Sequence, residues 1–383
     1  MNKYNKLLTP LSFPNGITLK NRIVMAPMTT WAGNDDFTVS DQELEWFKKR
    51  VEGVGMVITG CTHVKPEGIG FTNEFAAYDD RFLPGLTKLA AAAKSAGAPA
   101  ILQIFHAGHK AIPGLSPGRT VVSASDVPSE ITPFSAPDLV APRPLEEQEI
   151  WDVIAAFGDA ARRAIEAGFD GVEIHGAHGF LNQNFLSPMV NRRTDQWGGS
   201  LDNRLRFSTE VVREVRRVIA EYADRPFITG FRISPEESHQ EGLKLRDSLA
   251  LVDRLIHEQV DYLHFSLFHV LNQKPLNSQT PKTITQVLTD FINKRLPVIA
   301  AGQITTPAEA DKALQAGLDL VAIGRGLVIH PEWAQWAYEG IEDEITMVLD
   351  TDLAAEKKIP ENLMQYVQSA KGWIQTANQR KAS

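Results

Sequence analysis

The sequence predicts a (β/α)₈ barrel, the TIM-barrel architecture, from three observations. Short apolar runs recur at eight places along the chain, and helical patterns separate most of them. The runs are apolar throughout, which is typical of parallel strands that are buried on both faces. Eight such units favour closure into a barrel over an open sheet. The predicted strands are Ile23 to Ala26, Met56 to Thr59, Ala100 to Ile104, Gly171 to Ile174, Phe227 to Ile233, Tyr262 to Phe265, Pro297 to Ala300 and Leu320 to Ile323.

Two of the intervening helices have clear sequence signals. One is predicted to begin after Ser40, with Glu43 completing a capping box. The other precedes the fourth strand and stops at Gly168, as a helix with a C-terminal glycine should. Its apolar residues fall on one helical stripe: Ile150, Val153, Ile154, Phe157, Ala161, Ala164 and Ile165.

The segment from His106 to Pro144, after the third strand, departs from the regular barrel pattern. It is rich in Pro, Gly and Ser, has no helical stripe, and is too long for an ordinary βα loop. In a barrel, a long loop at this place would cap the active-site mouth. The alternative is a surface excursion without a role.

The 383 residues are predicted to form a barrel over residues 1–340 and a C-terminal helical extension over residues 341–383. The extension would pack on the barrel or on a neighbouring subunit. The second arrangement would make the protein a homo-oligomer. Barrels of this kind remain one domain at such lengths.

Composition narrows the class of partner. The net charge of -8 argues against a nucleic-acid binder, and no apolar run approaches the length of a membrane span. The only cysteine excludes an intrachain disulfide, and the first ten residues lack the apolar core of a secretory signal. We therefore expect a cytoplasmic protein that acts on small molecules.

Polar side chains and glycines occur where the predicted strands end. In a barrel these carboxyl ends form the active-site face. The side chains at the first five ends are Met28, Thr29, Cys61, Gln103, His175, His178 and Arg232. Gly302 and the pair Gly324 and Arg325 follow the last two strands, where barrels hold phosphate groups. The sequence thus predicts a site for a phosphorylated cofactor.

His175 and His178 are the most informative pair, because two imidazoles three residues apart can hold one polar atom. Two other interpretations are a metal site, which would need a third ligand, and a structural pair satisfied by the backbone.

Four motifs together are characteristic of one family. They are Asn-Arg-Ile-Val-Met-Ala-Pro-Met at 21–28, His-x-x-His-Gly-Phe at 175–180, the Gly-Arg at 324–325, and Phe-Leu-Ser-Pro-x-x-Asn-x-Arg-Thr-Asp-x-x-Gly-Gly-Ser-x-x-Asn-Arg at 185–204. Through them the chain resembles the Old Yellow Enzyme family of NAD(P)H-dependent FMN oxidoreductases and ene-reductases, from about Leu7 to about Trp333.

The resemblance implies that FMN binds in the barrel and that NADH or NADPH reduces it. It places Thr29 near the flavin C4 carbonyl, Gln103 at the pyrimidine edge and Arg232 at N1 and the C2 carbonyl. The backbone amide of Cys61 would approach the flavin while its thiol stays inert. The full set of implied FMN-binding residues is Ala26, Pro27, Met28, Thr29, Cys61, Gln103, Arg232, Ala301, Gly302, Gly324 and Arg325.

The resemblance also makes His175 and His178 a clamp for the oxygen of the acceptor. Family members that reduce alkenes commonly place a proton-donating tyrosine at the position of Phe180, which carries no such proton. Water or a side chain of the His106 to Pro144 loop could replace that donor. The acceptor is therefore a carbonyl-activated alkene, or a quinone, nitro compound, flavin or oxygen. Trp31 either narrows the substrate pocket or packs under a loop.

The residues are also compatible with two functions of other classes. One is a metal-dependent barrel hydrolase or lyase built on the histidine pair. The other is a non-catalytic flavin-binding protein in which Phe180 reflects lost chemistry. No Gly-x-Gly-x-x-Gly opens a βαβ unit, so no separate dinucleotide domain is expected.

Overall fold

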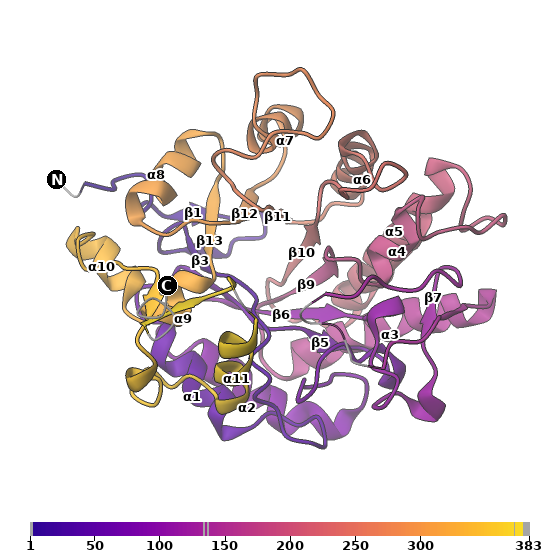
Figure 1. The fold of residues 1–383 in the computed structure, drawn as a ribbon, viewed down its shortest axis with the longest axis horizontal. Helices are drawn as coiled ribbons and strands as arrows, with labels where there is room; N and C mark the ends of the chain where they lie inside the picture. The colour runs from indigo at the N-terminus through magenta and orange to yellow at the C-terminus, as the bar shows by residue number, and fades with distance from the viewer. Residues whose placement is uncertain (1–2, 133–134, 136–137, 371, 378–383) are drawn as a thin grey trace.

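Eight parallel strands form a closed barrel in the computed structural model, which describes residues 3–132, 135, 138–370 and 372–377. Strand β4 pairs with both β3 and β6, and this second pairing closes the sheet. A short strand, β5 (Thr62–His63), extends the pairing along β6. The prediction of a (β/α)₈ barrel and of its eight strands is confirmed (Figure 1). The barrel strands are β3 (Ile23–Met25), β4 (Met56–Ile58), β6 (Ala100–Phe105), β9 (Gly171–Gly176), β10 (Ile228–Ile233), β11 (Tyr262–Ser266), β12 (Val298–Ala301) and β13 (Leu320–Ile323).

Helices surround the barrel between its strands (Figure 1). In the described part of the chain no helix combines the length and apolar character that crossing a membrane requires. The helices that follow β3 to β12 are α1 (Asp41–Arg50), α2 (Leu83–Ala93), α3 (Glu147–Glu166), α4 (Leu181–Leu186), α5 (Leu201–Tyr222), α6 (Leu245–His257), α7 (Ile284–Ile292) and α8 (Pro307–Gln315). Two more, α9 (Arg325–Ile329) and α10 (Trp333–Glu339), follow β13. Short 3₁₀ turns include Pro66–Gly68 and Asp80–Phe82.

The apolar stripe predicted for α3 is buried along its whole length, from Ile150 to Ile165. The helix ends at the predicted place, where Gly168 adopts a φ of 88° that a side chain would make unfavourable. α3 packs against α5 and against the outer faces of β6 and β9. The stripe therefore marks the face that covers the barrel.

The helix α1 begins after Ser40 as predicted, but the prediction of a capping box is wrong. The Ser40 hydroxyl accepts the Glu43 backbone N–H, which is half of the motif. The Glu43 side chain does not return the bond to the Ser40 backbone. It is buried and accepts a hydrogen bond from the hydroxyl of Thr30, in the segment after β3. The carboxyl group thus connects α1 to the segment that follows the first barrel strand.

Burial raises the pKa of Glu43 to about 7, so we expect this carboxyl group to make folding pH-dependent. A carboxyl whose pKa is higher in the folded state costs stability as the pH rises from about 4.5 to about 7, by up to about 3 kcal/mol. Glu43→Gln cannot ionise. The free energy of unfolding of Glu43→Gln, relative to that of the wild type, should therefore be larger at pH 8 than at pH 5. Urea denaturation at the two pH values measures it.

The control is Glu45→Gln, which alters an exposed carboxylate on the same helix. Its stability should follow that of the wild type at both pH values. An equal difference between Glu43→Gln and the wild type at pH 5 and pH 8 would contradict the prediction.

The amino end of the barrel is closed by an antiparallel hairpin of β1 (Leu11–Ser12) and β2 (Thr18–Leu19). Phe13 and Leu19 pack against side chains inside the barrel, and the rings of Phe13 and Tyr262 lie 6.3 Å apart. Because the hairpin packs against this end, we expect a ligand at the carboxyl end of the strands.

The long excursion after β6 begins with two 3₁₀ turns, Gly108–Lys110 and Pro117–Arg119. Two short strands, β7 (Val122–Ser123) within the excursion and β8 (Arg143–Pro144) at its end, pair with each other. The two ends of the segment between β7 and β8 thus lie side by side. Residues 133–134 and 136–137 of the predicted loop lie outside the described residues.

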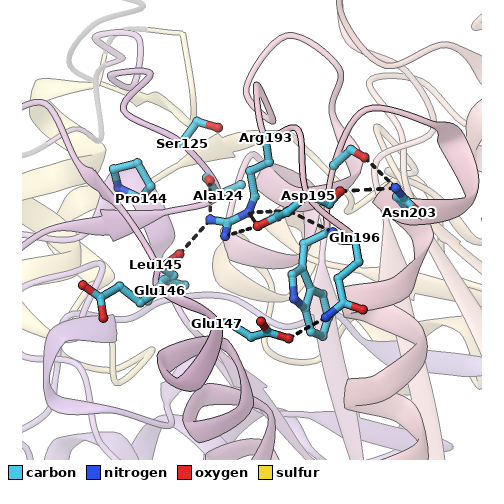
Figure 2. Close-up of polar contacts among 12 residues, drawn as sticks. Ala124, Ser125, Pro144, Leu145, Glu146, Glu147, Arg193, Asp195, Gln196 and Asn203 are labelled. Atoms are coloured by element: carbon cyan, nitrogen blue, oxygen red, sulfur yellow. Dashed lines mark hydrogen bonds and ion pairs between the residues drawn. The ribbon is translucent and has the colours of Figure 1, made fainter.

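Arg193, in the segment between α4 and α5, holds the residues that follow these two strands (Figure 2). Its Nη1 donates to the carbonyl oxygen of Ala124, at 3.1 Å, and to that of Leu145, at 2.7 Å. Asp195 holds the same guanidinium, with an Nη2 to Oδ2 distance of 2.6 Å. The motif at 185–204 therefore has a structural role, because its Arg-Thr-Asp segment holds the residues that follow β7 and β8.

The C-terminal segment lies against the carboxyl end of the barrel. It contains β14 (Val348–Leu349), a 3₁₀ turn at Thr351–Leu353, α11 (Glu361–Ser369) and β15 (Gln375–Thr376). Tyr366 of α11 stacks on Trp31, with ring centroids 3.9 Å apart, and the Asn362 amide donates to the Trp31 carbonyl at 2.8 Å. The segment is thus in direct contact with the loop that follows β3.

Candidate active site

A cavity of about 1030 Å³ opens at the carboxyl end of the barrel strands. It brings together every site residue that the sequence indicated, from seven of the eight strands or the loops that follow them. These residues are Ala26, Pro27, Met28, Thr29, Trp31, Cys61, Gln103, His175, His178, Phe180, Arg232, Ala301, Gly302, Gly324 and Arg325.

Strand register explains why the polar side chains meet. Arg232 of β10 lies directly opposite His175 of β9 and His264 of β11. Gln103 of β6 lies opposite Glu173, two residues before His175. Residues two apart on a strand point to the same side, so Glu173 and His175 occupy successive levels of the barrel interior.

Glu173 is a buried residue at the centre of this network that the sequence patterns did not indicate. Its carboxylate accepts hydrogen bonds from Gln103 Nε2 at 2.7 Å, and from the Tyr262 hydroxyl and His264 Nδ1, both at 2.9 Å. Although burial opposes ionisation, His264 and Arg232 lower the pKa of this carboxyl. The available signal was a carboxylate within an otherwise apolar strand, which must have partners.

Gln103 and Arg232 leave hydrogen-bonding capacity directed to a ligand. Gln103 gives one amide hydrogen to Glu173 and has a second, while its Oε1 receives only a weak contact from the Cys61 thiol at 3.4 Å. Arg232 is buried, and its Nε has no partner among the described residues. A buried N–H group without a partner is costly, so this site fits an acceptor such as the pyrimidine edge of a flavin.

Cys61 is a buried thiol beside this group. Burial raises its pKa far above the usual range, so the thiolate does not form near neutral pH. The side chain is suited to packing rather than to redox chemistry.

His175 and His178 form a pair of neutral imidazoles, with ring centroids 5.1 Å apart. Burial, together with His178 and Arg232, lowers the pKa of His175 well below its usual range. Desolvation by the cavity walls and the charge of Arg232 also lower the pKa of His178, although this residue is exposed at the cavity surface. Each ring therefore carries one N–H.

The hydrogen-bond network indicates which nitrogen holds each hydrogen. His175 Nδ1 accepts the Ala177 backbone N–H at 3.2 Å, which leaves the hydrogen on Nε2. Ser266 Oγ accepts from Arg232 at 3.3 Å and lies 2.7 Å from His178 Nε2. When the Ser266 hydroxyl donates its single hydrogen to that nitrogen, the His178 hydrogen lies on Nδ1. The pair offers two N–H donors.

His178 also has a strained backbone, with a φ of 62°. This left-handed conformation is uncommon for residues other than glycine and is often retained at functional sites. Two contacts hold it: its N–H donates to Ser234 Oγ at 3.1 Å, and its carbonyl accepts from Lys110 Nζ at 2.7 Å.

Phe180 lies beside the histidine pair in apolar surroundings. Its ring packs edge-on against His175 and Phe105, with centroids 4.8 and 4.9 Å away, and Phe71 lies 6.1 Å away. The ring is 5% exposed. These ring contacts accommodate the phenylalanine, and the residue supplies no exchangeable proton.

Glycines shape the opposite side of the cavity, after β12 and β13. Gly302 has a φ of 153°, and a Cβ there would lie 2.3 Å from the Leu267 carbonyl oxygen. At Gly324 a Cβ would contact the sulfur of Met28 at 3.3 Å. Arg325 donates one N–H to the Trp373 carbonyl at 3.0 Å, which leaves its other N–H groups for an anion.

Two segments outside the strands complete the mouth of the cavity. The excursion contributes His109, Lys110 and Glu130, and the C-terminal segment contributes Met347 and Trp373. Trp31 lines the cavity but is 3% exposed beneath Tyr366 and beside Trp373, so it has the packing role as well.

A parallel barrel with a neutral histidine pair, an amide and an arginine whose Nε has no partner among the described residues, all on one cavity, fits a flavin-binding barrel oxidoreductase. The chain belongs to the NADH:flavin oxidoreductase / NADH oxidase family, whose model matches residues 6–344.

Relatives cover nearly the whole chain. It is 41% identical over 372 residues to the probable NADH-dependent flavin oxidoreductase YqiG of Bacillus subtilis, which covers 97% of this chain and 98% of that protein. It is 38% identical over 371 residues to the NADH:fumarate oxidoreductase of Klebsiella pneumoniae, covering 96% of this chain and 39% of that longer enzyme. An NADPH dehydrogenase of Geobacillus thermodenitrificans is 35% identical over 83% of this chain and 89% of its own.

Solved structures have the same fold. The old yellow enzyme homologue of Zymomonas mobilis superimposes with a TM-score of 0.77 at 25% identity, covering 94% of this chain and 99% of that one. Morphinone reductase in complex with tetrahydroNAD gives 0.74 at 27% identity, covering 87% and 90%. The protein is therefore an FMN-dependent oxidoreductase that uses NADH or NADPH, as the resemblance implied, rather than a metal-dependent hydrolase.

Proposed function

We propose that the cavity binds FMN against Gln103 and Arg232 and that His175 and His178 hold the oxygen of a small-molecule acceptor. The observation that carries the proposal is that two neutral N–H donors share one cavity with an arginine whose Nε has no partner among the described residues. Bound FMN would transfer a hydride equivalent from NAD(P)H to the acceptor.

The residues proposed to bind FMN divide by chemistry. Gln103 would offer the pyrimidine edge both a donor and an acceptor, and Arg232 would place its charge at N1 and the C2 carbonyl. Thr29 would donate near the C4 carbonyl, and Arg325 with Gly302 and Gly324 would receive the phosphate. The remaining lining residues, Ala26, Pro27, Met28, Cys61 and Ala301, would shape the wall of the site.

The histidine pair would act when charge develops on the acceptor. Transfer of a hydride to the β-carbon of an activated alkene places negative charge on its carbonyl oxygen. Preorganised N–H donors aimed at that oxygen stabilise the transition state by about 3 to 4 kcal/mol for each donor. Because both rings are neutral and fixed by Ala177 and Ser266, they need no reorganisation to donate.

The acceptor is proposed to be a molecule that presents an oxygen to this pair. Two relatives are named for fumarate and acrylate, both of which are alkenes conjugated to a carboxyl group. The apolar ring of Phe180 supports a second candidate, a quinone, because a quinone is reduced at oxygen and needs no proton on carbon. Nitro compounds, free flavin and oxygen belong to the same second group.

Anaerobic reduction of the purified protein tests the proposal. We expect a yellow protein that NADH or NADPH bleaches and that enones or quinones restore. Phenol, added to the oxidised protein, should give the long-wavelength absorbance of a phenolate stacked on flavin. A protein that carries flavin but shows no such absorbance would contradict the role of the histidine pair, and one that retains no flavin after reconstitution would contradict the FMN site.

A further inference from the structure

Phe180 leaves open which group protonates the α-carbon of an alkene acceptor, and the contacts around its ring suggest an answer. Within the described residues, the Phe180 ring has ring or cation contacts with His178 and with four other residues. These four are Phe71, Phe105, His175 and Lys110. Phe71 and Phe105 have no exchangeable proton. The two histidines are committed to the acceptor oxygen. Lys110 remains.

We propose that Lys110, reaching in from the excursion after β6, donates the proton to the α-carbon of a carbonyl-activated alkene held by His175 and His178. The inference rests on the proposed function, since it requires the histidine pair to orient the acceptor. It makes the acceptor an alkene and assigns a catalytic residue to the long loop.

The position of Lys110 supports this role. Its Nζ lies 5.8 Å from the centroid of the Phe180 ring, on the face of that ring, and donates to the His178 carbonyl at 2.7 Å. It also packs against the backbone between these two residues, because a Cβ placed on Gly179 would lie 3.2 Å from Nζ. The ammonium group thus lies next to both the clamp and the ring that replaces the usual donor.

The electrostatics of Lys110 also suit proton transfer. No carboxylate of the described residues lies within 4.0 Å of its Nζ, so no ion pair holds the proton in place. Burial lowers the pKa of the ammonium, while Glu130 and Glu237 oppose the shift from a distance. A lowered pKa makes the group a better general acid near neutral pH.

The proposed reaction balances with the coenzyme that the family uses. A hydride originating from NAD(P)H forms a C–H bond at the β-carbon, and the proton of Lys110 forms one at the α-carbon. The C=C π bond breaks, the alkene gains two electrons, and NAD(P)H becomes NAD(P)⁺. Solvent water at the mouth of the cavity then protonates the neutral Lys110 amine.

The test compares two acceptors on the same anaerobically reduced holoenzyme. 2-Cyclohexenone needs a proton on carbon, and benzoquinone does not. In Lys110→Met the ratio of the enone rate to the quinone rate should fall by about 10²- to 10⁴-fold, which is the range for removal of a general acid. The control, Lys88→Met, replaces an exposed lysine on α2 and should keep the wild-type ratio.

Two further variants separate proton donation from charge and packing. Lys110→Arg keeps the positive charge, but a guanidinium does not release its proton near neutral pH, so its ratio should fall as in Lys110→Met. Adding Phe180→Tyr to Lys110→Met should restore the enone rate. A wild-type ratio in Lys110→Met or Lys110→Arg, or no rescue by the tyrosine, would overturn the proposal.

Phenol binding to the oxidised holoenzyme keeps this test distinct from that of the proposed function. Loss of the phenol absorbance in Lys110→Met would show that the lysine only supports His178, which overturns the role as donor. If the wild-type protein binds phenol and reduces benzoquinone but not 2-cyclohexenone, the role of Lys110 as proton donor is contradicted and the proposed function is not. Wild-type flavoprotein that does not bind phenol contradicts the proposed function itself.

Discussion

Replacing both His175 and His178 with alanine should abolish the phenolate absorbance and lower the rate of enone reduction by at least about 10²-fold, the cost of losing a single oxyanion donor. The reason is geometric: the free N–H groups of the two rings are fixed by the bonds of the opposite nitrogens to the Ala177 backbone and Ser266. Anaerobic stopped-flow measurement of flavin reoxidation gives the rate.

The flavin should remain bound in this double variant, because Gln103, Arg232 and the glycines after β12 and β13 are unchanged. His257→Ala, an exposed histidine in the last turn of α6, is the matched control. Phenol binding of wild-type strength in the double variant would contradict the assignment of the pair.

Replacing Arg232 with methionine should weaken FMN binding by about 10- to 100-fold, since hydrogen bonds to a charged group contribute about 1.5 to 3 kcal/mol. The buried Nε has no partner among the described residues, and Nη2 makes only a long hydrogen bond, of 3.3 Å, to Ser266. Titration of the apoprotein with FMN, followed by quenching of flavin fluorescence, measures the change.

Arg232→Lys separates charge from geometry, because it keeps a cation near Glu173 but loses the planar guanidinium. We expect an affinity between those of wild type and Arg232→Met. Circular dichroism of each apoprotein checks that the barrel is folded, and Arg217→Met, on the exposed side of α5, is the surface control. Wild-type FMN affinity in a folded Arg232→Met would remove Arg232 from the proposed site.

The fold followed from periodicity because each strand of a barrel covered by helices is apolar on both faces, and the eight runs matched the eight strands within about two residues. The one local error, the capping box at Ser40, had a tertiary cause. A Glu at the third helical position ordinarily bonds back to the cap, but here Thr30 competes for the carboxyl from another part of the chain.

The lining of the candidate site was predictable where a residue type is tied to a strand end, as with Gln103, His175 and Arg232. Glu173 could not be found in this way, because it lay inside an apolar run and its partners Tyr262 and His264 come from a strand about 90 residues further along. Lys110 lay in a loop with no periodicity, so its approach to Phe180 depends on how the excursion folds back.

The grip of Arg193 on Ala124 and Leu145 has a consequence for how such enzymes can diversify. Because Ala124 and Leu145 are anchored at one guanidinium, the part of the excursion between them can be replaced as a unit. Its length and sequence can change at a small entropic cost, without shifting the register of β6 or the start of α3. The segment over the cavity mouth, and with it the substrate range, can thus change during evolution while the residues at the strand ends stay the same.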